Sequence, residues 1–172
     1  ADWGSRRPLV GFLNLTAAQR SSIGDDGIDA DLDAWLDAGP RPLYVGFGSM
    51  RIKNPDALSG AILHAAEALD LRVLVAQGWN DFMSDVDDPR VRVVGAIDHD
   101  AVLPRCAAVM HHGGAGSVAA GLRAGAPTIV AWLSADQPLW GAMLARAGVG
   151  ASQRMSKVTG AWLTDSLRKV LS

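Results

Sequence analysis

Cysteine is nearly absent from this chain, which has only Cys106 among its 172 residues. A single cysteine excludes an internal disulfide, and a reducing compartment then fits the chain best. We therefore expect a cytoplasmic protein. Cys106 lies at an apolar helix end, which is typical of a buried and inert thiol.

An excess of charge and long apolar runs are lacking as well. The formal net charge is −2 at pH 7, which gives no basic footprint for nucleic acid. Asp, Arg and Gly interrupt every apolar run before it reaches the about 20 residues of a membrane-spanning helix. The chain starts without Met and without the apolar core of a signal peptide, so we expect a segment of a longer protein.

What the sequence does have is the composition of one globular domain. Hydrophobic residues make up 49% of the chain, and its length suits a single domain with a real core. Residues 1–29 are weakly periodic and rich in Gly, Ser and Asp, so they are predicted to be an interdomain linker. Within it, residues 8–15 are expected to be an extended piece laid against the domain. Residues 30–172 are predicted to form the domain itself.

Strand and helix patterns alternate from residue 30 onward. We expect strands at 43–47, 72–76, 91–94, 107–110 and 128–132, with a minor one at 149–151. Helices are expected at 31–36, 56–68, 100–105, 117–124, 137–147 and 159–171. Nearly continuous apolar strands that alternate with helices predict an α/β fold, a doubly wound parallel sheet of the Rossmann-like kind.

The most informative stretch runs from Met110 to Ser117, where a strand, a Gly-rich turn and a helix start follow one another. Glycines let the backbone approach a ligand, and the free N–H groups and dipole of a helix start favour an anion. His112, at the strand end, can donate to a phosphate oxygen, whereas alternation should turn His111 away. The sequence predicts a phosphate cradle here. The alternative is that the turn serves only tight packing.

Parallel sheets bind ligands at the carboxyl ends of their strands, where the strand order reverses. The segment 46–49, the turn after His112 and the loop before Asp136 all follow predicted strands. We therefore expect one pocket to use all three.

These segments together resemble one half of GT-B glycosyltransferases, the donor-binding half of the nucleotide-sugar enzymes of the UDP-glycosyltransferase family. The resemblance is greatest to the sterol, glycolipid and antibiotic glycosyltransferases. It covers residues 40–171 and is carried by the segments 42–50, 78–79, 94–97, 111–117, 121–127 and 136–141. The resemblance implies no metal or other cofactor. A UDP- or dTDP-sugar would be the co-substrate.

The resemblance implies a role for several residues. The donor diphosphate would be held by His112, Gly114, Ala115, Gly116, Ser117 and Ser49. The nucleotide base would lie at Ile97 and Asp98, and the transferred sugar at Asp136 and Gln137. Trp132, just before the sugar loop, is a candidate for contact with the donor. No catalytic residue is expected in this chain, because the general base of the family belongs to an N-terminal acceptor domain.

The implied function is the donor half of an inverting transfer from a UDP- or dTDP-sugar to the hydroxyl of a sterol, glycolipid or natural product. The alternatives are a non-catalytic nucleotide-sugar-binding module and a related GT-B enzyme such as a UDP-GlcNAc epimerase. Peripheral membrane contact of the whole protein would suit a lipid acceptor, and the isolated domain is expected to be inactive.

Other site types match the sequence poorly. His99, His111 and His112 have no Cys or carboxylate at the usual spacing of a metal site. The segment 46–51 lacks the third glycine of a dinucleotide fingerprint. Ser117 lacks the flanking glycines of an esterase nucleophile.

Overall fold

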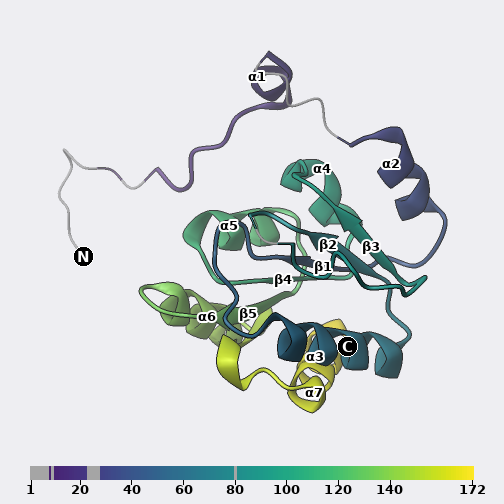
Figure 1. Cartoon of the computed structure of the whole chain (residues 1–172). Helices are drawn as coiled ribbons and strands as arrows, with labels where there is room; N and C mark the ends of the chain where they lie inside the picture. Colours follow the sequence, from purple (N-terminus) through teal and green to yellow (C-terminus); the bar gives the residue numbers. More distant parts are fainter. Residues whose placement is uncertain (1–7, 9, 23–27, 80) are drawn as a thin grey trace.

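The computed structural model describes residues 8, 10–22, 28–79 and 81–172. Its centre is a six-stranded sheet with helices on both faces (Figure 1). The strands are β1 (Leu43–Gly46), β2 (Val73–Ala76), β3 (Val91–Val94), β4 (Ala108–His111), β5 (Thr128–Trp132) and β6 (Gly150–Arg154). All of them pair in parallel, in the order β3-β2-β1-β4-β5-β6. The predicted doubly wound, Rossmann-like sheet is confirmed.

The helices divide between the two faces because successive strand residues point to opposite sides. Helices α3 (Pro55–Leu69) and α7 (Gly160–Leu171) pack on the face that carries Leu43 and Val45. Helices α2 (Ala30–Asp37), α4 (His99–Val102), α5 (Ala115–Arg123) and α6 (Gln137–Arg146) cover the face that carries Tyr44, Val109 and Val130. With both faces covered, the central strands need apolar side chains at every position.

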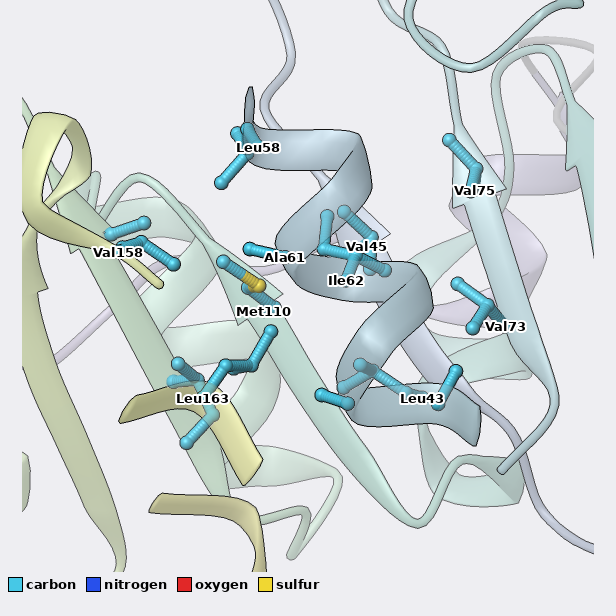
Figure 2. Close-up of a cluster of buried hydrophobic side chains, with 14 of the residues drawn as sticks. Leu43, Val45, Leu58, Ala61, Ile62, Val73, Val75, Met110, Val158 and Leu163 are labelled. Carbon is cyan, nitrogen blue, oxygen red and sulfur yellow. The ribbon is translucent and has the colours of Figure 1, made fainter. Parts of the chain in front are cut away.

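The core beneath α3 shows how this helix is fixed. Ile62 of α3, Met110 of β4 and Leu163 of α7 are fully buried together (Figure 2). Burying each such side chain contributes roughly 1.5–3 kcal/mol. The helix starts where the Asn54 side chain accepts a hydrogen bond from the Ala57 N–H at 3.2 Å. It ends at Asp70, whose φ of 51° lies in the left-handed region.

Two predicted elements differ from those observed. The helix expected at 100–105 is the short α4 followed by a 3₁₀ turn, η1 (Leu103–Arg105), because Pro104 has no N–H to continue an α-helix. The strand expected at 149–151 is the longer β6, which pairs with β5 along its whole length. Its polar residues are partly buried or, for Arg154, exposed, because β6 is an edge of the sheet.

The segment predicted as a linker contains a helix that we did not expect, α1 (Ala17–Ser22). Of the predicted linker, residues 1–7, 9 and 23–27 lie outside the described residues. Within the predicted extended piece, the ring of Phe12 contacts the ring of Trp140 in α6, with 6.2 Å between the ring centroids. Arg20 of α1 forms two ion pairs, with Nε 3.3 Å from Asp98 Oδ2 and Nη1 2.7 Å from Asp100 Oδ2. The N-terminal segment therefore touches the domain beside α4 and α6.

Within the described ranges, no helix combines the length and the apolar character that crossing a membrane requires.

Candidate functional site

The strand order reverses between β1 and β4, and at this point the following helices leave on opposite faces of the sheet. Helix α3 follows β1 on one face and α5 follows β4 on the other (Figure 1). The divergence leaves a crevice outside the carboxyl ends of the strands, where ligands bind in sheets of this kind.

A cavity of about 210 Å³ lies at this reversal, on the α4 and α5 side. Its walls are mainly apolar, with the polar groups of Tyr44, His99, His111 and Ser117 among them. The lining residues are Tyr44, Gly46, Gly48, Ala76, Gly78, Gly95, Ala96, Ile97, His99, Leu103, Val109, His111, Ser117 and Ala120. The cavity thus uses the strand ends of β1, β2, β3 and β4. The loop before Asp136 is not part of its lining, so our expectation of one pocket shared by all three loops is only partly right.

The N-terminus of α5 opens toward this crevice. Gly114 is the N-cap, and no side chain caps the helix there. The first backbone hydrogen bond of the helix is donated by Val118 N–H to Gly114 O at 3.0 Å. The N–H groups of Ala115, Gly116 and Ser117 therefore precede the hydrogen-bonded part of the helix. A Cβ on Gly116 would meet no atom within 4 Å. The backbone here is open to an approaching anion.

His112 stands beside this helix start and is half-buried. Its Nδ1 is buried and has no hydrogen-bond partner among the described residues. Burial lowers the pKa of His112, while the Asp136 carboxylate acts in the opposite direction. Removal from water favours the neutral imidazole, and a nearby anion favours the charged one. His112 therefore has an uncommitted nitrogen and a charge state that an anion would shift.

Asp136, at the start of α6, is exposed, and its Oδ2 accepts a hydrogen bond from Trp140 Nε1 at 2.8 Å. A Cβ on Gly113 would lie 3.3 Å from Gln137 Cβ, so the start of α6 packs against the turn that follows His112. The structure thus brings together the residues predicted for the sugar and for the phosphate.

Gln137, predicted for the sugar, also has a contact within its own loop that we did not expect. It is only 6% exposed, and its Oε1 accepts from Leu133 N at 2.8 Å and from Ser134 N at 3.2 Å. This carbonyl holds the loop after β5, in which Ala135 has a φ of 57°. The side-chain oxygen is already used within the loop, which leaves the amide nitrogen as the group that Gln137 can offer to a ligand.

Of the remaining predicted residues, some lie at the cavity and others do not. Ile97 lines the cavity, whereas Ser49 is exposed in the turn after β1 and is not among its lining residues. The Asp98 carboxylate caps α4 by accepting from Asp100 N at 2.9 Å, and it also contacts Arg20. Its side chain has structural partners, so it is the backbone of this segment that remains to pair with a ligand.

His111 is the residue whose position differs most from our expectation. It does diverge from His112, with ring centroids 6.4 Å apart and a 70° angle between the planes. The face to which it turns is the one that borders the cavity, where it lies with Ile97 and Ser117. Alternation along β4 was predicted correctly, but it is His111, and not His112, that lines this cavity.

Trp132 lines a second cavity of about 480 Å³ on the α3 side of the sheet edge. The Arg154 guanidinium lies 5.8 Å from the centre of its ring, within reach of a cation–π contact. Leu133 and Ser134 border the same cavity. The loop after β5 thus forms part of the wall of this cavity, and the role of Trp132 in donor contact stays a prediction.

Within the described part of the chain, no three His, Cys, Asp or Glu side chains are grouped so as to hold a metal ion.

Several proteins are similar in sequence to this chain over most or all of its length. A model of the erythromycin biosynthesis protein CIII-like C-terminal domain matches residues 60–172. The glycosyltransferase Rv1524 of Mycobacterium tuberculosis is 40% identical over the whole chain, which covers 40% of that protein. The sterol 3-beta-glucosyltransferase UGT80A2 of Arabidopsis thaliana is 37% identical over 88% of the chain and 23% of its own length. The chain therefore spans well under half the length of these relatives.

Solved structures agree on the fold. The glycosyltransferase VinC, determined in complex with dTDP, has a TM-score of 0.64 and 24% identity over 85% of this chain and 37% of its own. The six-stranded sheet with its flanking helices matches the C-terminal half of such enzymes. Its fold is thus that of glycosyltransferases such as VinC, and the chain belongs to the family of erythromycin biosynthesis protein CIII-like C-terminal domains.

Proposed function

We propose that this domain binds a pyrimidine nucleotide sugar, a UDP- or dTDP-sugar, and presents it for transfer. The observation that carries the proposal is the junction of the cavity with the start of α5 and His112. Ser117 belongs to both, since it lines the cavity and stands in the first turn of α5. A ligand with an uncharged planar part and an anionic part suits such a junction. The dTDP complex of VinC supports a nucleotide as that ligand.

The proposed reaction is an inverting transfer in the whole protein. An acceptor hydroxyl attacks the anomeric carbon in line, the bond from that carbon to the diphosphate breaks, and the hydroxyl proton passes to a base. We assign that base to the acceptor-binding part of the protein, as in the resemblance noted above. The charge that develops on the leaving diphosphate would be stabilised by His112 and by the N–H groups of Ala115, Gly116 and Ser117. Fixed dipoles of this kind are among the largest contributions to catalysis.

The acceptor is proposed to be a sterol, a glycolipid or a natural product. Support comes from the sterol glucosyltransferase among the relatives and, for a natural product, from the fold shared with CalG4, the calicheamicin glycosyltransferase. A cytoplasmic place of action is proposed with it, on the basis of Cys106, a buried free thiol.

Calorimetric titration of this chain with UDP, dTDP, UDP-glucose and dTDP-rhamnose tests donor binding directly. Binding of a nucleotide, tightened or changed by the attached sugar, is the expected result. Absence of binding to all four ligands would reject the proposal.

Incubation with a radiolabelled donor and a hydroxyl acceptor should give no transfer by this chain alone. Transfer above the rate of donor hydrolysis would show that the base lies within the chain, and an epimerised donor would indicate an epimerase.

A further inference from the structure

His111 has one ring nitrogen that is used and one that is not. Its Nδ1 accepts a hydrogen bond from the Gly113 N–H at 2.9 Å. Its Nε2 is buried and has no partner among the described residues. The side chain is only 1% exposed, so bulk water does not satisfy this nitrogen. A buried polar atom without a partner is costly and needs an explanation.

The chemical state of His111 follows from the same contacts. Because Nδ1 accepts from Gly113, the ring proton of the neutral imidazole must lie on Nε2. Burial lowers the pKa of His111 to about 3, and the neighbouring His112 and His99 act in the same direction. The ring is thus neutral at pH 7, and Nε2–H is a hydrogen-bond donor.

The position of this donor indicates what it meets. His111 pairs in register with Gly46 of β1 and lies in the cavity with Tyr44 and His99. The Tyr44 hydroxyl and His99 Nε2 are 3.0 Å apart and satisfy each other. His111 Nε2–H is therefore a fully buried donor, on a residue that lines this cavity, that lacks a partner within the described residues.

A phosphate is a poor match for this donor. The walls around His111 include Leu103, Val109 and Ala120, and a charged group placed among them would lose its hydration. The start of α5 and His112 already provide for an anion nearer to solvent. The part of the ligand that enters the apolar cavity should be uncharged but should carry an acceptor oxygen.

We propose that His111 Nε2–H donates a hydrogen bond to an uncharged oxygen of the bound nucleoside, either a carbonyl of the pyrimidine or an oxygen of its pentose. This inference rests on the proposed nucleotide-sugar function and divides the two histidines by task. His111 recognises the nucleoside, and His112 holds the diphosphate. His111 is thereby a binding residue for the donor, although its neighbour carries the phosphate role implied by the resemblance.

Two substitutions separate this donor from the turn that His111 supports. His111→Asn keeps an acceptor near the position of Nδ1 for the Gly113 N–H and removes the reach of Nε2. His111→Gln places an amide N–H near the position of Nε2 and gives up the bond to Gly113. Thermal unfolding without ligand shows whether both variants fold, and calorimetry then measures UDP, inorganic pyrophosphate and ribose 5-phosphate on each.

His111→Asn should weaken UDP binding about five- to tenfold, as expected for one lost hydrogen bond, and leave pyrophosphate unchanged. His111→Gln should recover most of the UDP affinity. His112→Gln, measured in parallel, should weaken pyrophosphate and UDP alike. A loss of ribose 5-phosphate binding in His111→Asn would assign the bond to the pentose, and no change there would assign it to the base.

Equal UDP affinity in the parent chain and in His111→Asn would overturn the inference while leaving the proposed function intact. A parallel loss of pyrophosphate would also overturn it, because His111 would then act through the turn. If the parent chain binds neither UDP nor dTDP, the proposed function itself fails and the inference fails with it.

Discussion

The imidazole of His112 lies over Gly114, so that a Cβ on Gly114 would stand 2.5 Å from His112 Nε2. The backbone of Gly114, with φ −62° and ψ 143°, is one that any residue can adopt. The ring in this position, and not the backbone angle, is what leaves no room for a Cβ here. Gly113 is the opposite case, because its φ of 91° favours glycine on its own.

The first prediction concerns this contact. Gly114→Val should weaken UDP binding more than His112→Ala does, because the β-branched side chain both displaces the imidazole and obstructs the approach to α5. Calorimetry with UDP on the two variants measures the difference. If Gly114→Val binds UDP as well as the parent chain, then neither the ring position nor the backbone approach matters for the ligand.

Gly116→Ala offers a matched test of the backbone approach. Because a Cβ there meets no atom within 4 Å, the variant should fold at least as well as the parent, with a helix gain of roughly 0.5–1 kcal/mol. The added methyl group should nevertheless weaken UDP binding by about 1–3 kcal/mol, the usual cost of overpacking a filled site. Denaturant unfolding and calorimetry give the two numbers. Unchanged UDP affinity would mean that no ligand comes close to this turn of α5.

Asp136 should discriminate between sugars and not between nucleotides. Asp136→Ala should weaken UDP-sugar binding by about 1–3 kcal/mol, the cost of leaving polar partners unpaired, and leave UDP nearly untouched. Trp140→Phe is the companion variant, since it removes the 2.8 Å hydrogen bond that orients the carboxylate but keeps an aromatic ring for the contact with Phe12. It should give a smaller loss in the same direction. Equal losses for UDP and UDP-sugar would show that Asp136 is structural.

The fold was largely predictable from the sequence because hydrophobic patterning carries most of its information. The apolar segments at 43–46, 73–76 and 108–110 are nearly fully buried strands, as their lack of polar alternation predicted. Helix α1 was missed although Thr16 and Gln19 form a capping box, with Gln19 N donating to Thr16 Oγ1 at 3.3 Å. That signal was present, but a helix of this length has no apolar periodicity to draw attention to it.

The site was predictable in its location but less so in its contacts. Alternation correctly separates His111 from His112, but no local pattern tells which face of β4 borders a cavity, since α4 and the ends of β1–β3 build that cavity. The loop-holding role of Gln137 was likewise hidden, because an amide three or four residues after its partners suits a ligand contact equally well. Both depend on tertiary packing.

The contact between α5 and β5 gives a test of the fold itself. A Cβ on Gly121 would lie 2.8 Å from Thr128 Oγ1, so the helix packs directly on the strand. Gly121→Ala should lower the free energy of unfolding by about 1–3 kcal/mol, as overpacking usually does. In the Thr128→Ala background the same change should cost much less, since the hydroxyl is gone. Additive effects in this double-mutant cycle would contradict the contact.

The last prediction is a pH dependence carried by His112. Burial keeps its pKa below the ordinary 6.5 in the free protein, with Asp136 opposing this only in part. A bound diphosphate would raise that pKa, so proton and ligand binding favour each other. UDP affinity should therefore be highest at pH values below the pKa of His112 in the free protein. It should fall as the pH rises, until the pKa of His112 in the complex is passed.

UDP itself also titrates in this range, so the control is His112→Gln, measured with the same ligand from about pH 5 to 8. The parent chain should lose more affinity across the range than the variant does. Parallel profiles for the two proteins would show that His112 carries no charge toward the phosphates.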